Sequence, residues 1–178
     1  MRRVILLLTV MVPVLVVVSG VALAATLNGT DRADTLVGTP KGDSIKGFGG
    51  GDTLRGKGSA DTLRGYTGAD TMTGGGGGDT LYGGKGADTM RGNAGSDKLY
   101  GGYGDDTIYG GKGDDTTDGQ AGTDTLIGGP GNDRIFDRSG NNNSIFAKDG
   151  EQDLICVAGG SGNVETDRYD RLIFNESC

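Results

Sequence analysis

An aspartate returns every nine residues across much of this chain, and this period constrains the fold more than any other feature. The run has twelve members, namely Asp34, Asp43, Asp52, Asp61, Asp70, Asp79, Asp88, Asp97, Asp106, Asp115, Asp124 and Asp133. A glycine stands five residues before each aspartate, from Gly29 to Gly128. An aliphatic residue or Met stands two residues after it in eleven of the twelve repeats, the exception being Thr117. The repeat therefore reads G-G-x-G-x-D-x-U-x, as in GGYGDDTIY at 101–109.

This period predicts short strands that stack in coils. Side chains alternate in an extended chain, so the residue two after each aspartate points to one face and its neighbours to the other. We expect each nonapeptide to divide into a six-residue loop and a three-residue strand, with two nonapeptides making up each coil. The inward side chains then form two stacks that face each other between two short parallel sheets. One stack is Leu36, Leu54, Met72, Met90, Ile108 and Leu126, and the other is Ile45, Leu63, Leu81, Leu99, Thr117 and Ile135.

The first residues of the chain are typical of a secretory signal peptide. Arg2 and Arg3 precede an apolar run at 4–18 and a small-residue Ala-Leu-Ala site at 22–24, so we expect residues 1–24 to be removed on export. The alternative is a retained membrane anchor, since the apolar run is nearly long enough to span a bilayer.

The remaining chain divides into an array and two caps. Residues 25–46 carry two imperfect repeats, which we interpret as an N-terminal cap, because terminal repeats of a solenoid close the stack against water. Residues 47–136 are the regular array. After Phe136 the period decays, with Asn142 at the next position of the count, and we interpret residues 137–178 as a C-terminal cap.

The charge of the chain limits its possible binding partners, and its cysteine content indicates an oxidising compartment. Without residues 1–24 the chain has 15 basic and 24 acidic residues, a net charge of −9, which disfavours nucleic acid and anionic membranes as partners. We expect a monomer. The two cysteines, Cys156 and Cys178, both follow the array, and an even pair in an exported chain predicts one disulfide.

The repeat chemistry predicts a bound metal and indicates which one. The chain has no His, and its cysteines lie outside the array, so zinc and copper have no ligand set. Glycines allow left-handed turns that direct carbonyl oxygens toward a common centre, and the aspartate adds a carboxylate. Six or more hard oxygens from a flexible backbone favour calcium over magnesium.

The repeat also resembles that of the RTX, or hemolysin-type, calcium-binding family, over residues 29–136. The resemblance implies a right-handed parallel β-roll with calcium held between the loops of successive coils. Each aspartate then pairs with the next but one in the run, on the following coil, which gives ten pairs. The pairs that use Asp34 and Asp43 have Arg32 and Lys41 in their loops, which leaves eight better sites in a total of eight to ten.

These features predict a secreted, non-catalytic module that folds on binding extracellular calcium. The sequence has neither a His for acid–base chemistry nor an H-E-x-x-H or G-x-S-x-G motif, so we expect no enzymatic activity. A second hypothesis is a surface adhesin. Thr follows the aspartate in nine of the twelve repeats, and this ladder could bind ice or the glycans of a cell surface or matrix, although Thr also simply suits an exposed strand.

Overall fold

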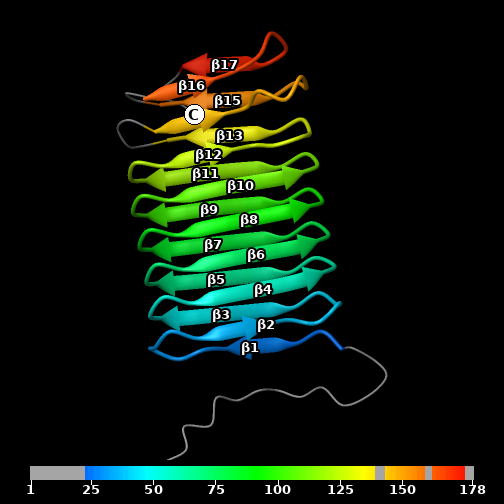
Figure 1. Cartoon of the computed structure of the whole chain (residues 1–178), viewed down its shortest axis with the longest axis vertical. Coiled ribbons are helices and arrows are strands. Elements are labelled where there is room, and N and C mark those ends of the chain that lie inside the picture. The colour runs from blue at the N-terminus through cyan, green and yellow to red at the C-terminus, as the bar shows by residue number, and fades with distance from the viewer. Residues whose placement is uncertain (1–22, 139–142, 159–161, 175–178) are drawn as a thin grey trace, which may run out of the picture.

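The computed structural model describes residues 23–138, 143–158 and 162–174, which form a tall stack of short strands (Figure 1). These residues contain strands and no helix, so none of them belongs to a helix that could cross a membrane. Most of the predicted signal peptide, residues 1–22, lies outside the described residues.

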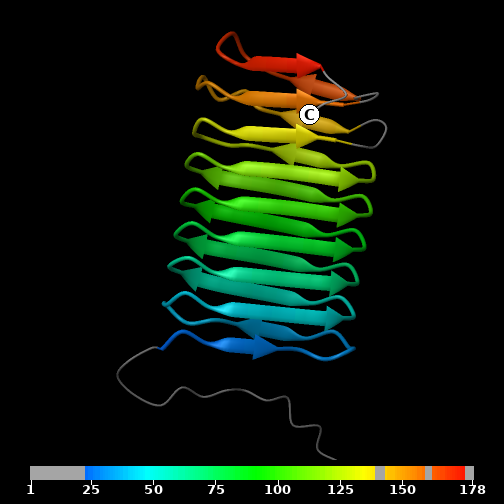
Figure 2. The same ribbon diagram turned by 180° about the vertical axis from the view of Figure 1, so that it is seen from behind.

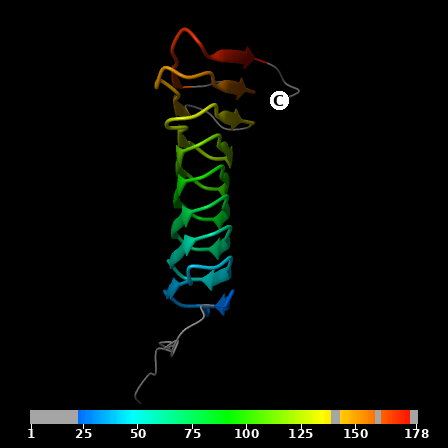
Figure 3. The same ribbon diagram turned by 90° about the vertical axis from the view of Figure 1, so that its right-hand side faces the viewer.

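Two parallel sheets make up the stack, one on each side (Figures 2 and 3). The nine-stranded sheet contains β1 (Thr26–Asn28), β3 (Ser44–Gly49), β5 (Thr62–Thr67), β7 (Thr80–Lys85), β9 (Lys98–Tyr103), β11 (Thr116–Ala121), β13 (Arg134–Asp137), β15 (Leu154–Val157) and β17 (Arg171–Phe174). The eight-stranded sheet contains β2 (Thr35–Val37), β4 (Thr53–Gly58), β6 (Thr71–Gly76), β8 (Thr89–Ala94), β10 (Thr107–Lys112), β12 (Thr125–Ile127), β14 (Ser144–Phe146) and β16 (Asn163–Glu165). Consecutive strands alternate between the sheets, so each coil of the solenoid contributes one strand to each.

The strand register confirms the predicted coil of two nonapeptides. In the eight-stranded sheet Leu54 pairs with Met72, and in the nine-stranded sheet Leu63 pairs with Leu81. The same offset of two repeats holds for every strand pair from β1 to β13. The chain is therefore an all-β parallel solenoid.

The core is the pair of stacks that the period predicts. From Ile45 to Ile135 the inward aliphatic and Met side chains are fully buried, and Leu27, Leu36 and Val164 pack against this cluster near the two ends of the stack. Thr117 is also fully buried in the core, and its hydroxyl has no hydrogen-bond partner among the described residues.

The predicted division of each repeat into a short strand and a long loop is wrong. Strands β3 to β11 are six residues long. The pairing resumes after the repeat glycine, as Lys57 with Gly75 and Gly58 with Gly76. The residue after this glycine has a positive φ, as at Lys57 with +96°, but the chain stays in the ladder, so the turn shrinks to three residues.

Parallel pairing also continues beyond Phe136, through the segment interpreted as a cap. Paired residues there are 19 positions apart for Thr125 and Ser144, 20 for Arg134 and Leu154, and 17 for Leu154 and Arg171, whereas the regular offset is two nonapeptides. Coils of unequal length hide this part of the solenoid from a nine-residue count.

Candidate metal centre

The twelve periodic aspartates lie in the turns, in two columns along opposite edges of the stack. The first column precedes the strands of the eight-stranded sheet and contains Asp34, Asp52, Asp70, Asp88, Asp106 and Asp124. The second column precedes the strands of the nine-stranded sheet and contains Asp43, Asp61, Asp79, Asp97, Asp115 and Asp133. From Asp52 onward each of these side chains is nearly inaccessible to solvent, with 1–2% exposed.

Within each column, one carboxylate oxygen of each aspartate from Asp52 onward accepts a hydrogen bond from the backbone of the preceding coil. The Asp52 Oδ1 atom accepts the backbone N–H of Asp34 at 2.8 Å, and the Asp133 Oδ1 atom accepts that of Asp115 at 2.9 Å. All ten pairs that the resemblance implies are joined in this way, over 2.7–2.9 Å. The fold therefore brings together every predicted pair through Oδ1.

In most of these residues the second carboxylate oxygen finds no hydrogen-bond donor in the part of the chain that the structure describes. The Oδ2 atom is buried and unpartnered in ten of the twelve, namely Asp52, Asp61, Asp70, Asp79, Asp88, Asp97, Asp106, Asp115, Asp124 and Asp133. A buried polar atom normally finds a partner, and leaving a charged one without a partner is costly. The row of Oδ2 atoms therefore needs cations or protons.

The geometry of the turn explains why the repeat requires glycine. A Cβ atom on Gly65 would lie 2.1 Å from Asp70 Oδ2 and 2.7 Å from the Gly83 carbonyl oxygen of the next coil. The same turn needs a left-handed residue at Gly68, where φ is +132° and a Cβ atom would lie 1.8 Å from the Gly50 carbonyl oxygen. Carboxylate and carbonyl oxygens thus crowd together over the first glycine, in a space that no side chain can occupy.

This crowding shifts the acidity of the carboxyl groups. Burial, reinforced by neighbouring carboxylates, raises the pKa to about 7 in five of them, Asp79, Asp88, Asp106, Asp115 and Asp133. It raises the pKa of Asp124 to about 6 for the same reasons. The charged form is therefore poorly accommodated unless a cation balances it.

The first aspartate of each column differs from the rest. Asp34 Oδ2 accepts hydrogen bonds from the N–H of Thr30 at 2.6 Å and its hydroxyl at 2.8 Å, and Asp43 Oδ2 accepts the N–H of Thr39 at 2.5 Å. Sequence reasoning set these two apart because Arg32 and Lys41 are nearby. The structure adds a different reason, which is that their second oxygen is already satisfied.

Three residues that the sequence count missed extend the columns. Asn143 Oδ1 accepts the N–H of Asp124 at 2.6 Å, Asp153 Oδ1 accepts that of Asp133 at 2.8 Å, and Asp170 Oδ1 accepts that of Asp153 at 3.2 Å. Asn143, not Asn142, takes the column position because the coil has one extra residue; Asn142 lies outside the described residues. The available signal was that all three directly precede a strand.

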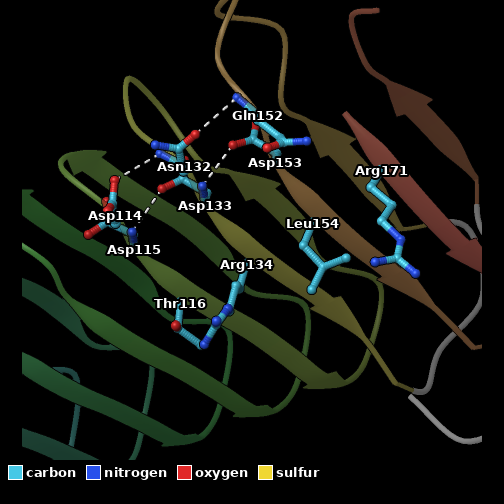
Figure 4. A pocket seen from close by; sticks show the side chains of 10 residues that line it. All are labelled: Asp114, Asp115, Thr116, Asn132, Asp133, Arg134, Gln152, Asp153, Leu154 and Arg171. Atoms are coloured by element: carbon cyan, nitrogen blue, oxygen red, sulfur yellow. Dashed lines mark hydrogen bonds between the residues drawn. The ribbon is translucent and has the colours of Figure 1, made fainter. Parts of the chain in front are cut away.

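A pocket of about 530 Å³ lies beside the C-terminal end of the second column (Figure 4). Around it, a row of exposed side chains runs outside the buried column. Asp114 Oδ1 accepts the N–H of Asn132 at 3.0 Å, and Asn132 Oδ1 accepts that of Gln152 at 3.3 Å. Arg134 and Arg171 also line the pocket, so its charge is mixed.

The oxygen atoms available in the columns fit a calcium ion that is coordinated largely by backbone carbonyls. Within the described ranges, no three acidic, His or Cys side chains converge on a point that could hold a metal. Any ion in the columns must therefore complete its shell with carbonyl oxygens and water. Calcium accepts six to eight such ligands in flexible geometry, whereas magnesium requires a tight octahedron.

The structure describes one of the two cysteines of the predicted disulfide. Cys156 lies in β15 and is 6% exposed, and Cys178 lies outside the described residues. The Cys156–Cys178 bridge stays a prediction.

The repeats match a known family. The family model described as RTX calcium-binding nonapeptide repeat (4 copies) matches residues 28–63, 46–81, 56–90, 82–117 and 118–147. None of the curated proteins matches this sequence. The matched segments cover two thirds of the chain and include all twelve periodic aspartates and the strands from β2 to β14. The chain therefore belongs to the RTX calcium-binding nonapeptide-repeat family.

Proposed function

We propose that this chain is an exported, non-catalytic β-roll that binds calcium along both aspartate columns and folds as it does so. The observation that carries the proposal is the row of ten buried Oδ2 atoms without donors among the described residues. A calcium ion beside each pair of coils would neutralise these carboxylates and hold successive turns together. RTX membership supports the choice of calcium.

Eight sites are the expected number. They lie between coils joined by the pairs from Asp52/Asp70 to Asp115/Asp133, because the Oδ2 atoms of Asp34 and Asp43 are occupied by threonine donors. Eight ions carry a charge of +16 against −9 for residues 25–178, so full loading makes the module positive. The expected affinity is that of extracellular calcium modules, with dissociation constants of about 10⁻⁴–10⁻³ M.

Coupling of folding to binding follows from the thin core. Each nonapeptide buries one aliphatic side chain, while its glycines lose much conformational entropy on ordering. Without cations, the buried carboxylates add a further electrostatic cost. We expect the calcium-free chain to be largely unfolded at neutral pH.

Far-ultraviolet circular dichroism of residues 25–178 tests the coupling. Adding calcium should convert a disordered spectrum into a β-sheet spectrum, and EDTA should reverse the change; magnesium at the same concentration should have little effect. A spectrum that responds to neither calcium nor EDTA would contradict the proposal.

An adhesin is the second candidate, and one feature favours it. The eight-stranded sheet carries an uninterrupted outward ladder of threonines in register, namely Thr35, Thr53, Thr71, Thr89, Thr107 and Thr125. Such a flat row suits ice or a neutral glycan. Replacing four of them, Thr53, Thr71, Thr89 and Thr107, with Lys should abolish such binding and leave calcium-induced folding intact. Binding that survives these changes would exclude the ladder as the site.

A further inference from the structure

The distribution of charge over the coils differs sharply from the net charge of the chain. Between Ser44 and Tyr103, a stretch that the structure describes in full, there are seven basic and six acidic residues. All six acidic residues are periodic aspartates buried in the columns. All seven basic residues reach the surface. The solvent-facing surface of these coils therefore carries formal positive charge alone, although the whole chain is acidic.

Large side chains gather on one side of this stretch. We define the aromatic–basic face as the outward surface of β3, β5, β7 and β9 that carries Lys46, Phe48, Arg64, Tyr66, Tyr82 and Tyr100. Phe48, Tyr66 and Tyr82 are each 39–40% exposed. On the eight-stranded sheet the equivalent rows of β4, β6, β8 and β10 hold one aromatic residue, Tyr109. Tyr and Arg are the residue types enriched at binding hot spots.

Backbone strain accompanies two of these rings. Phe48 and Tyr66 have φ angles of +79° and +77°, in a region that bulky residues rarely adopt. The next coils place Gly84 and Gly102 at the same position, so glycine satisfies this site without strain. The same repeat position also has a positive φ at Lys57, Asn93 and Gln120 on other coils, so this backbone conformation belongs to the repeat. Phe48 and Tyr66 are the aromatic residues that occupy it.

The ring arrangement indicates what kind of ligand fits. Phe48 stacks on Tyr66 with centroids 5.3 Å apart, and Tyr82 stacks on Tyr100 at 5.2 Å. The Arg64 guanidinium covers Tyr82 at 5.1 Å from its centroid. Because the rings cover one another, they offer mainly edges and hydroxyls outward, which does not suit stacking with nucleic-acid bases. Hydroxyls beside cations suit a polymer that carries both hydroxyl groups and anionic groups.

We propose that the aromatic–basic face binds a linear anionic polysaccharide, with Lys46 and Arg64 pairing with its acidic groups and Tyr82 and Tyr100 donating hydrogen bonds to its hydroxyls. The rows run along a rigid axis, so a linear polymer that lies along this axis meets the basic groups of β3 and β5 and then the tyrosine hydroxyls of β7 and β9. The positive charge of this face requires calcium to neutralise the buried columns, so the proposal rests on the proposed function. The site itself lies on the sheet opposite the threonine ladder.

Hyaluronate, a linear uronate-bearing polysaccharide, is a suitable probe. Its binding to residues 25–178 can be measured by isothermal titration calorimetry in a buffer that contains calcium. Folding is first verified by circular dichroism, so that failure of calcium-coupled folding is seen separately from failure of glycan binding. Binding should weaken as salt rises, since exposed charges are screened. Neutral dextran should not bind.

Matched variants locate the site. Lys46→Gln with Arg64→Gln should weaken hyaluronate binding about tenfold. Arg55→Gln with Arg91→Gln removes the same charge from the eight-stranded sheet and should have little effect. Tyr66→Gly should fold at least as well in calcium and bind more weakly.

Three results would overturn the proposal. The first is a correctly folded wild-type chain that does not bind hyaluronate. The second is an equal loss of affinity in the two double variants, which would indicate diffuse charge attraction. The third is tighter binding of double-stranded DNA than of hyaluronate at the same salt concentration, which would assign the face to nucleic acid.

Discussion

Replacing Asp106 with Asn should remove cation ligands from the centre of the first column and leave its turn intact. Asp106 Oδ1 accepts the N–H of Asp88 at 2.8 Å, and its own N–H donates to Asp124 Oδ1 at 2.9 Å. An asparagine Oδ1 can accept the first bond, as Asn143 does further along the same column at 2.6 Å. What the variant loses is the negative charge of the unpartnered Oδ2 atom.

The magnitude follows from the number of coils that share this carboxylate. Asp106 belongs to two consecutive pairs, with Asp88 and with Asp124, so two proposed sites lose a ligand. A site at calcium a hundredfold above its dissociation constant stabilises the fold by about 2.7 kcal/mol. Loss of both sites would lower the free energy of unfolding by up to about 5 kcal/mol, and partial retention by less.

Urea denaturation followed by circular dichroism measures this loss, at about 10 mM calcium, a hundredfold above a dissociation constant of about 10⁻⁴ M. Asp105→Asn is the matched control, because Asp105 is the preceding residue, is exposed, and accepts a hydrogen bond from the N–H of Thr123 at 2.8 Å. We expect the control to change stability by less than about 0.5 kcal/mol. Equal losses for Asp105→Asn and Asp106→Asn, or none for either, would refute the assignment of the columns as cation sites.

Three further predictions concern the core, the turn and acidity. Thr117→Val should raise the free energy of unfolding in calcium by about 1–3 kcal/mol, because it removes a buried hydroxyl that has no partner among the described residues; lower thermal stability would contradict this. Gly83→Ala should destabilise the fold by about 3 kcal/mol or more, because its Cβ atom would lie 2.3 Å from Asp88 Oδ2. Gly76→Ala is the control, because its Cβ atom would lie 4.0 Å from its nearest neighbour. Thermal denaturation in calcium should show a loss of stability for the first variant and little change for the second. Folding raises the pKa of Asp88 and of Asp106 from 3.8 to about 7, so the calcium-free fold binds more protons than the unfolded chain. The stability of the calcium-free fold should therefore be greatest below about pH 4 and decline toward pH 7. Circular dichroism of metal-depleted protein that shows more structure at pH 8 than at pH 4 would contradict this.

The regular part of the fold could be predicted from the sequence because one side chain per nonapeptide determines it. Leu54 and Met72 stand two repeats apart and pair as predicted, and so do Leu63 and Leu81. The aspartate pairs follow from the same period. The nine-residue period does not predict the length of the strands, because the parallel pairing continues past a glycine that resembles a loop residue.

Other features depended on contacts that no period encodes. The last coils differ from one another in length, so the nine-residue count passes over Asn143 and Asp153, although each directly precedes a strand. The hydrogen bonds from Thr30 to Asp34 and from Thr39 to Asp43 come from the second repeat position, where the consensus has glycine, so the consensus does not predict them. The positive outer surface was hidden because the net charge counts buried and exposed residues alike.

The position of bound calcium tests the account most directly. A crystal of residues 25–178 grown in calcium would give anomalous difference peaks at the ions. We expect peaks in the turns of both columns, between successive coils and within bonding distance of the Oδ2 atoms of the periodic aspartates from Asp52 to Asp133. Empty columns, or peaks only at exposed carboxylates such as Asp105 and Asp114, would contradict it.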